Sequence, residues 1–186
     1  MRIFEDRYDR DRQKFDLALR MLGLGAALST ITECTGLTAD RIRTLREAHA
    51  PRRSGRRTRA PRDPLCLLRS ARLAFEASTL GSLFCILGVL KSEFNAEMMC
   101  IAYEAYVQVS RPPRLSIDHA HILLVSLIRN KDLKLNVCGQ CRRSYISHTS
   151  RIHLANCGCS LRSLGIPRRR RRATRNHEKL LPSVGK

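Results

Sequence analysis

The sequence predicts a mainly α-helical protein with a small zinc-binding module near its C-terminus. Two observations support this prediction: apolar residues recur at helical spacing through most of the chain, and four cysteines gather between positions 138 and 159. A third observation concerns the binding partner: 35 basic residues against 16 acidic ones give a formal net charge of +19. A chain this basic is expected to bind a polyanion such as nucleic acid.

The N-terminal segment, residues 1–49, is expected to form three helices. Apolar residues at helical spacing predict the first over residues 11–24 and the second over residues 25–34. Gly36 provides a stop signal for the second helix, and Thr38 is placed to cap the third. The N-terminus carries charges where a secretory signal would have an apolar region, so we expect a cytoplasmic protein.

The second and third helices have the spacing of a helix-turn-helix unit. Gly36 stands at the turn, where a left-handed backbone favours glycine. In such a unit the N-terminal part of the second helix enters the major groove of DNA. This arrangement would direct Arg41, Arg43 and Thr44 at DNA. The alternative is an ordinary helical hairpin with an exposed arginine face.

A basic linker and a helical core follow. Residues 50–64 hold six arginines and three prolines and are predicted to be a linker. Residues 65–134 are predicted to be the helical core, with helices over 65–91, 96–109 and 116–130. The longest uncharged stretch in this core is too short to span a bilayer, so no membrane partner is expected.

Residues 135–162 are predicted to be a zinc module. Thiolates in two pairs separated by fifteen residues can converge on one tetrahedral zinc ion. The second pair is one residue shorter than the usual C-x2-C, so His148 or His153 could replace one thiolate. Four protein ligands leave no position for substrate, which indicates a structural site. The predicted ligands are Cys138, Cys141, Cys157 and Cys159.

The other four cysteines lie in apolar helical stretches. Without a secretory signal these thiols are expected to be reduced and to behave as small buried hydrophobes. They are Cys34, Cys66, Cys85 and Cys100.

Residues 163–186 are predicted to be a disordered basic tail, since they contain five consecutive arginines and no aromatic residue. The tail would contact phosphates without reading sequence, through Arg168, Arg169 and Arg170. The sequence has no glycine-rich phosphate loop, nucleophile elbow or H-E-x-x-H motif, so we do not expect an enzyme.

Two parts of the chain carry a family resemblance. The helical segment from Leu17 to His49 resembles the N-terminal helices of FlhC, a subunit of the bacterial flagellar master transcriptional activator. The order of the later features is similar too: a proline-containing linker, an apolar helical core, a C-x2-C pair followed by Tyr145–His148, a second cysteine pair and a basic tail. The most specific parts are Thr35–Glu47 and Cys138–Cys159.

The resemblance implies a cytoplasmic, mostly helical activator that binds zinc through the four cysteines. It also implies a hetero-oligomer with FlhD that binds promoter DNA and recruits RNA polymerase to flagellar operons. Three features differ from the family: the shortened second cysteine pair, the absence of tryptophan and the arginine-rich linker. The alternatives are an RNA-binding zinc protein and a zinc-stabilised interaction scaffold.

Overall fold

The structure, a computed structural model, describes residues 2–49, 60–91 and 93–150. Within these ranges the protein is mainly helical, as predicted, with a single small antiparallel sheet. None of the helices described is long and apolar enough to cross a membrane. Most of the linker 50–64, all of the tail 163–186 and the second cysteine pair lie outside the described residues.

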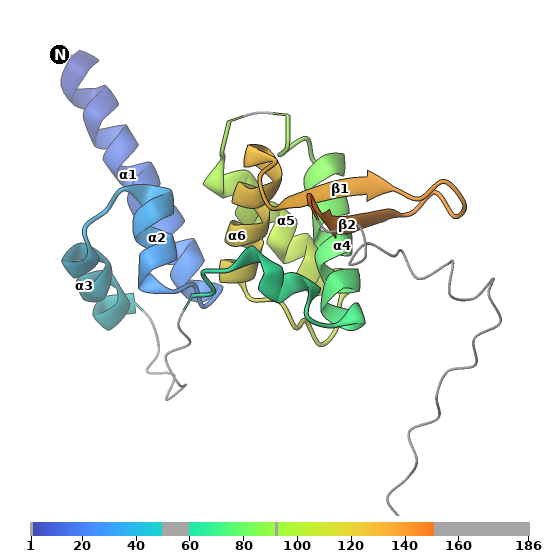
Figure 1. The fold of residues 1–186 in the computed structure, drawn as a ribbon. Coiled ribbons are helices and arrows are strands. Elements are labelled where there is room, and N and C mark those ends of the chain that lie inside the picture. The colour runs from blue at the N-terminus through green and yellow to red at the C-terminus, as the bar shows by residue number, and fades with distance from the viewer. Residues whose placement is uncertain (1, 50–59, 92, 151–186) are drawn as a thin grey trace, which may run out of the picture.

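Three helices form the N-terminal unit: α1 (Arg2–Gly23), α2 (Leu28–Thr35) and α3 (Ala39–His49). Each packs against the other two (Figure 1). The three predicted helices are confirmed, but α1 begins at Arg2 and not at residue 11. Its first half extends away from the rest of the molecule. Charged residues dominate the sequence of this half, so no apolar period reveals where the helix begins.

The central body consists of a short 3₁₀ helix η1 (Pro64–Leu68) and the helices α4 (Ala71–Ile86), α5 (Ala96–Val109) and α6 (Ile117–Arg129). The predicted continuous helix over 65–91 is wrong. Ser70 interrupts it, because its side chain accepts a hydrogen bond from the Leu73 N–H at 3.2 Å and so caps a new helix. The helix then ends before Gly88, whose φ is 72°.

A β-hairpin completes the body. Strands β1 (Leu133–Val137) and β2 (Ser144–His148) pair antiparallel, and β2 packs against α4. The Ile146 N–H on the outer edge of β2 donates to the Ser78 hydroxyl at 3.0 Å. Gly81 allows the close approach, since a Cβ there would lie 3.2 Å from a Leu135 methyl group. The tip of the hairpin extends beyond α4 (Figure 1).

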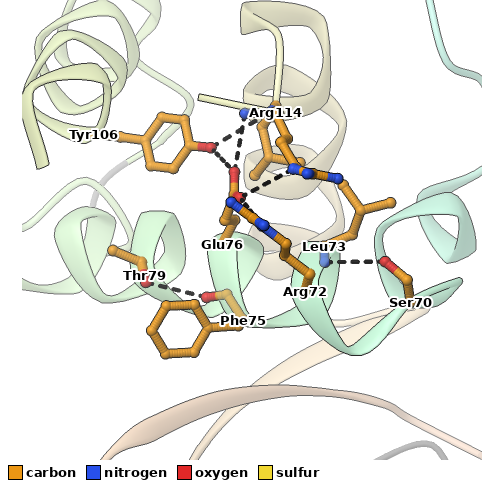
Figure 2. Close-up of polar contacts among 9 residues, drawn as sticks. Ser70, Arg72, Leu73, Phe75, Glu76, Thr79, Tyr106 and Arg114 are labelled. Carbon is orange, nitrogen blue, oxygen red and sulfur yellow. Dashed lines mark hydrogen bonds and ion pairs between the residues drawn. The ribbon is translucent and has the colours of Figure 1, made fainter. Parts of the chain in front are cut away.

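Glu76 is a buried carboxylate that holds the body together (Figure 2). It is only 6% exposed and accepts hydrogen bonds from the Tyr106 hydroxyl at 2.5 Å and the Arg114 N–H at 3.0 Å. The Arg72 guanidinium lies 3.6 Å away. Burial opposes ionisation, but these hydrogen bonds and Arg72 outweigh it and lower the pKa of Glu76. The carboxylate thereby links α4, α5 and the loop before α6.

Candidate DNA- and metal-binding residues

The turn between α2 and α3 is fixed by local hydrogen bonds. Gly36 adopts a φ of 71°, and its N–H donates to the Thr32 carbonyl at 2.9 Å. The buried Thr35 hydroxyl donates to the Ile31 carbonyl at 2.8 Å and accepts from the Leu37 N–H at 3.2 Å. These bonds satisfy polar groups at the end of α2, so the chain can turn within three residues and begin α3.

Apolar side chains pack in the angle between α2 and α3. Ile31, Leu37 and Ile42 are buried, and Leu45 is half-buried against the same core. The opposite side of α3 is consequently open to solvent.

The three residues predicted on α3 to contact DNA are all exposed. Arg41 is on the open side, close to the start of the helix. Arg43 donates to the Asp40 carboxylate at 2.5 Å, and the Thr44 hydroxyl donates to the Asp40 carbonyl at 3.1 Å. Of the three residues, Arg41 is therefore the best placed to contact a phosphate or base, because its two neighbours already bond within the helix.

Cys138 and Cys141 lie at the tip of the β-hairpin and are half-buried. The Cys138 N–H donates to the Arg143 carbonyl at 2.9 Å, which extends the ladder by one pair beyond the strands. The Cys138 carbonyl accepts from the Arg142 N–H at 3.0 Å, and Arg142 takes a positive φ of 59°. This tight turn brings the two cysteines to the same end of the hairpin, as half of a tetrahedral thiolate site would require.

His148 lies at the opposite end of the hairpin from the two cysteines. It pairs with Leu133 at the base of the hairpin, five positions from Cys138 along the ladder, which corresponds to about 17 Å. A zinc ion contacts each ligand at about 2.0–2.3 Å, so His148 cannot share an ion with Cys138 and Cys141 in this register. The option that His148 replaces a thiolate is therefore wrong.

The remaining predicted ligands, Cys157, Cys159 and the alternative His153, lie outside the described residues, as do the tail residues Arg168, Arg169 and Arg170. In the part of the chain that the structure describes, no group of three or more histidine, cysteine or acidic side chains could hold a metal ion. The described residues thus supply two of the four predicted zinc ligands.

Three of the other four cysteines are at least half-buried, as predicted. Burial raises the pKa of the Cys34 thiol to about 12 and that of the Cys100 thiol to about 11, so both are protonated at neutral pH. Cys66 is half-buried. The prediction is wrong for Cys85, which is exposed on α4 because the apolar pattern of that helix continues onto its solvent face.

The sequence did not reveal how the N-terminal unit joins the body. Asp118 in the first turn of α6 is only 3% exposed, and its carboxylate accepts from the Ala27 N–H at 2.9 Å and the Thr30 hydroxyl at 2.6 Å. Arg20 on α1 forms two hydrogen bonds to Glu104 on α5, at 2.8 and 2.7 Å. An acidic residue in the first turn of a helix is ordinarily explained by its interaction with the helix dipole. The sequence therefore gives no signal that Asp118 accepts hydrogen bonds from the N-terminal unit.

A cavity of about 340 Å³ lies beside this junction, between α2, α6 and residues 60–62. His121 on its wall approaches the Glu33 carboxylate at 3.7 Å and packs edge-on against the Phe94 ring. Burial lowers the pKa of His121, although Glu33 opposes the shift, so the ring is neutral at pH 7.

No protein-family model matches this chain, and a search of curated proteins finds no matching sequence. The resemblance to FlhC therefore stays a prediction that depends on the residues quoted above.

Proposed function

We propose that the protein is a DNA-binding transcriptional activator subunit resembling FlhC, which acts in the cytoplasm with an FlhD-like partner and RNA polymerase at flagellar operons. The observation that carries this proposal is the arrangement of α2, the left-handed Gly36 and α3. The two helices bury their facing apolar residues against α1 and leave the first turns of α3 in solvent. Helix-turn-helix proteins present their recognition helix to the major groove in this manner.

Charge supports the same proposal. The net charge of +19 favours a polyanion, and Arg41 adds a cation at the end of α3 that would enter the groove. Asp40 neutralises part of the contribution of Arg43. The affinity is therefore expected to come from Arg41 together with the arginines of the linker and tail.

We propose further that one structural zinc ion organises the C-terminal part of the chain. The hairpin would present Cys138 and Cys141, and Cys157 and Cys159 would complete the ligand set. Ser150 is near the base of the hairpin, and the seven residue steps from it to Cys157 can span about 23 Å. This exceeds the hairpin length of about 17 Å, so the chain is long enough to bring the second pair back to the tip. The ion would supply folding free energy and no reaction.

The test is to co-purify the full chain with a candidate FlhD subunit and to measure zinc per chain and retention of flagellar promoter DNA together. We expect one zinc per chain and salt-sensitive retention of the promoter. Zinc near zero with no retention of DNA by the complex would contradict the proposal. If structured RNA outcompeted duplex DNA at equal salt, the RNA-binding alternative would be favoured instead.

A charge-matched pair of variants tests the role of α3. Removing one phosphate contact should reduce the slope of log affinity against log salt concentration by about 0.9. Arg41→Ala is expected to do so, whereas Arg111→Ala, which removes an exposed arginine from the loop between α5 and α6, should leave the slope unchanged. Equal slopes for the two variants would show that α3 does not contact the DNA.

A further inference from the structure

The solvent side of α4 carries an apolar stripe that the fold leaves uncovered among the described residues. Phe75 is 62% exposed and Ile86 is 78% exposed, and Thr79 and Ser82 lie between them at helical spacing. We call these four residues the α4 stripe. The other sides of the helix face α5, α6 and the β-hairpin. Figure 2 shows Phe75 and Thr79 on one side of α4, while Glu76 turns toward Tyr106.

The two polar residues of the α4 stripe donate their hydroxyl protons within the helix. The Thr79 hydroxyl donates to the Phe75 carbonyl at 3.1 Å, and the Ser82 hydroxyl donates to the Ser78 carbonyl at 2.7 Å. Both are only half-exposed and small. Phe75 and Ile86 are eleven residues apart, or about 16 Å along the helix axis. Two large apolar side chains therefore flank two small side chains, against which another helix can pack closely.

The exposed charges at the N-terminal end of the α4 stripe are basic. Arg69 and Arg72 are both exposed there, whereas Lys91 and Glu93, one charge of each sign, are exposed beyond the C-terminal end. The only acidic residue of α4 is Glu76, which is buried; it lies 3.6 Å from the Arg72 guanidinium, whose side chain stays 60% exposed. A partner that covers the stripe would therefore meet cations at its N-terminal end. A second copy of this chain, with its own charge of +19, is disfavoured by repulsion.

We propose that the α4 stripe is the docking surface for an amphipathic helix of a partner protein, whose apolar face is flanked by acidic residues. Its leucine-like side chains would cover Phe75 and Ile86, and its carboxylates would meet Arg69 and Arg72. This inference rests on the proposed function only for the presence of a protein partner, and it requires neither DNA nor zinc.

The test uses the full chain with p-benzoylphenylalanine in place of Phe75 and two probe peptides of about five helical turns. Both peptides carry leucine along one face; one has glutamate and the other lysine on the flanks. Mass spectrometry after irradiation identifies what lies on the stripe. We expect a cross-link to the glutamate peptide and none to the lysine peptide. Cross-links to residues 151–186 of the same chain, or to a second copy, would identify another occupant and overturn the proposal.

Affinity measured by fluorescence anisotropy supplies the second readout. Phe75→Ser and Ile86→Ser leave the charge unchanged and should each weaken binding of the glutamate peptide by about tenfold or more, as expected for a lost buried apolar contact. Val109→Ser removes a residue that is 69% exposed on α5 and is the matched control, with no change expected. An equal loss in all three variants, or no binding of the peptide at all, would overturn the proposal. Promoter retention by Phe75→Ser then reports on the proposed function separately.

Discussion

The N-terminal unit and the central body are both helical, but the contacts that stabilise each of them differ in kind. In the N-terminal unit, the turn at Gly36 is built from hydrogen bonds between residues two to four positions apart, and a few apolar side chains close it. In the central body, Glu76 bonds to residues 30 and 38 positions away, and the hairpin docks on α4 through Ser78. The unit can thus present a solvent-facing helix, whereas the body depends on contacts distant in sequence.

The largest effect is expected in the core of the body. Phe84 is completely buried, so Phe84→Ala should lower the free energy of unfolding by about 3–5 kcal/mol. Ile86→Ala, two positions further along the same helix and exposed, should change it by no more than about 0.5 kcal/mol. Chemical denaturation followed by circular dichroism measures both. A similar loss in the two variants would contradict the assignment of the faces of α4.

The second-largest effect is expected at the junction between the N-terminal unit and the central body. Asp118→Ala leaves the Ala27 N–H and the Thr30 hydroxyl without their acceptor, and should lower the free energy of unfolding by about 2–3 kcal/mol. Asp118→Asn keeps an acceptor oxygen and should cost less. Limited proteolysis should then cut the Ala variant first between the N-terminal unit and the body. An unchanged cleavage pattern would show that Asp118 does not couple them.

Two tyrosines on α5 allow a hydrogen bond to the buried Glu76 carboxylate to be compared with a hydrogen bond to a neutral carbonyl. Tyr106→Phe removes a donor to Glu76 and the acceptor of the Leu115 N–H, and we expect a loss of about 2 kcal/mol. Tyr103→Phe removes one neutral bond to the Leu115 carbonyl and should cost about 1 kcal/mol. Thermal and denaturant unfolding measure the difference. Equal losses would mean that Glu76 contributes nothing beyond a neutral acceptor.

The smallest effect is the dependence of stability on pH. Burial lowers the pKa of His119 and His121 below 6.5, so the unfolded chain binds more protons, and the free energy of unfolding should begin to fall as pH drops below 6.5. The pKa of Glu76 is lowered by the hydrogen bonds that outweigh its burial, and that of Glu104 is lowered chiefly by its hydrogen bonds from Arg20. Their contribution is present above pH 4.5 and is lost below it.

Denaturant titrations at pH 7, 5.5 and 4 check this order. In His121→Leu the first decrease should become smaller, while the second decrease should remain. If His121→Leu left the decrease between pH 7 and 5.5 unchanged, the buried neutral state of this ring would be refuted.

The elements that sequence reasoning found are those whose signals are local. Gly36 ends α2 because its backbone adopts the left-handed conformation, and Ser116 caps α6 by accepting from the His119 N–H. The first half of α1 had no apolar pattern to reveal it. The position of the hairpin depends on its packing against α4 and not on its own residues alone, so a local pattern could not reveal it.

The candidate site also contains some residues whose placement follows from local sequence and others whose placement depends on the tertiary structure. The exposure of Arg41, Arg43 and Thr44 follows from the helical period once Ile42 is placed inside. The pairing of Arg43 with Asp40 is also local, since it spans a single helical turn. By contrast, the exclusion of His148 from the cysteine pair required the strand register, which the sequence did not specify.

By itself the sequence determined the helical class, the boundaries set by caps and glycines, the basic charge and the cysteine spacing, because each depends on residues within a few positions of one another. Only the tertiary structure decided which acidic residues are buried, where the hairpin docks and which side of α4 stays exposed. Those outcomes depend on which surfaces meet after the chain has folded back on itself. The same apolar period in α4 could have been covered on every side; the packing of α5, α6 and β2 left Phe75 and Ile86 in solvent.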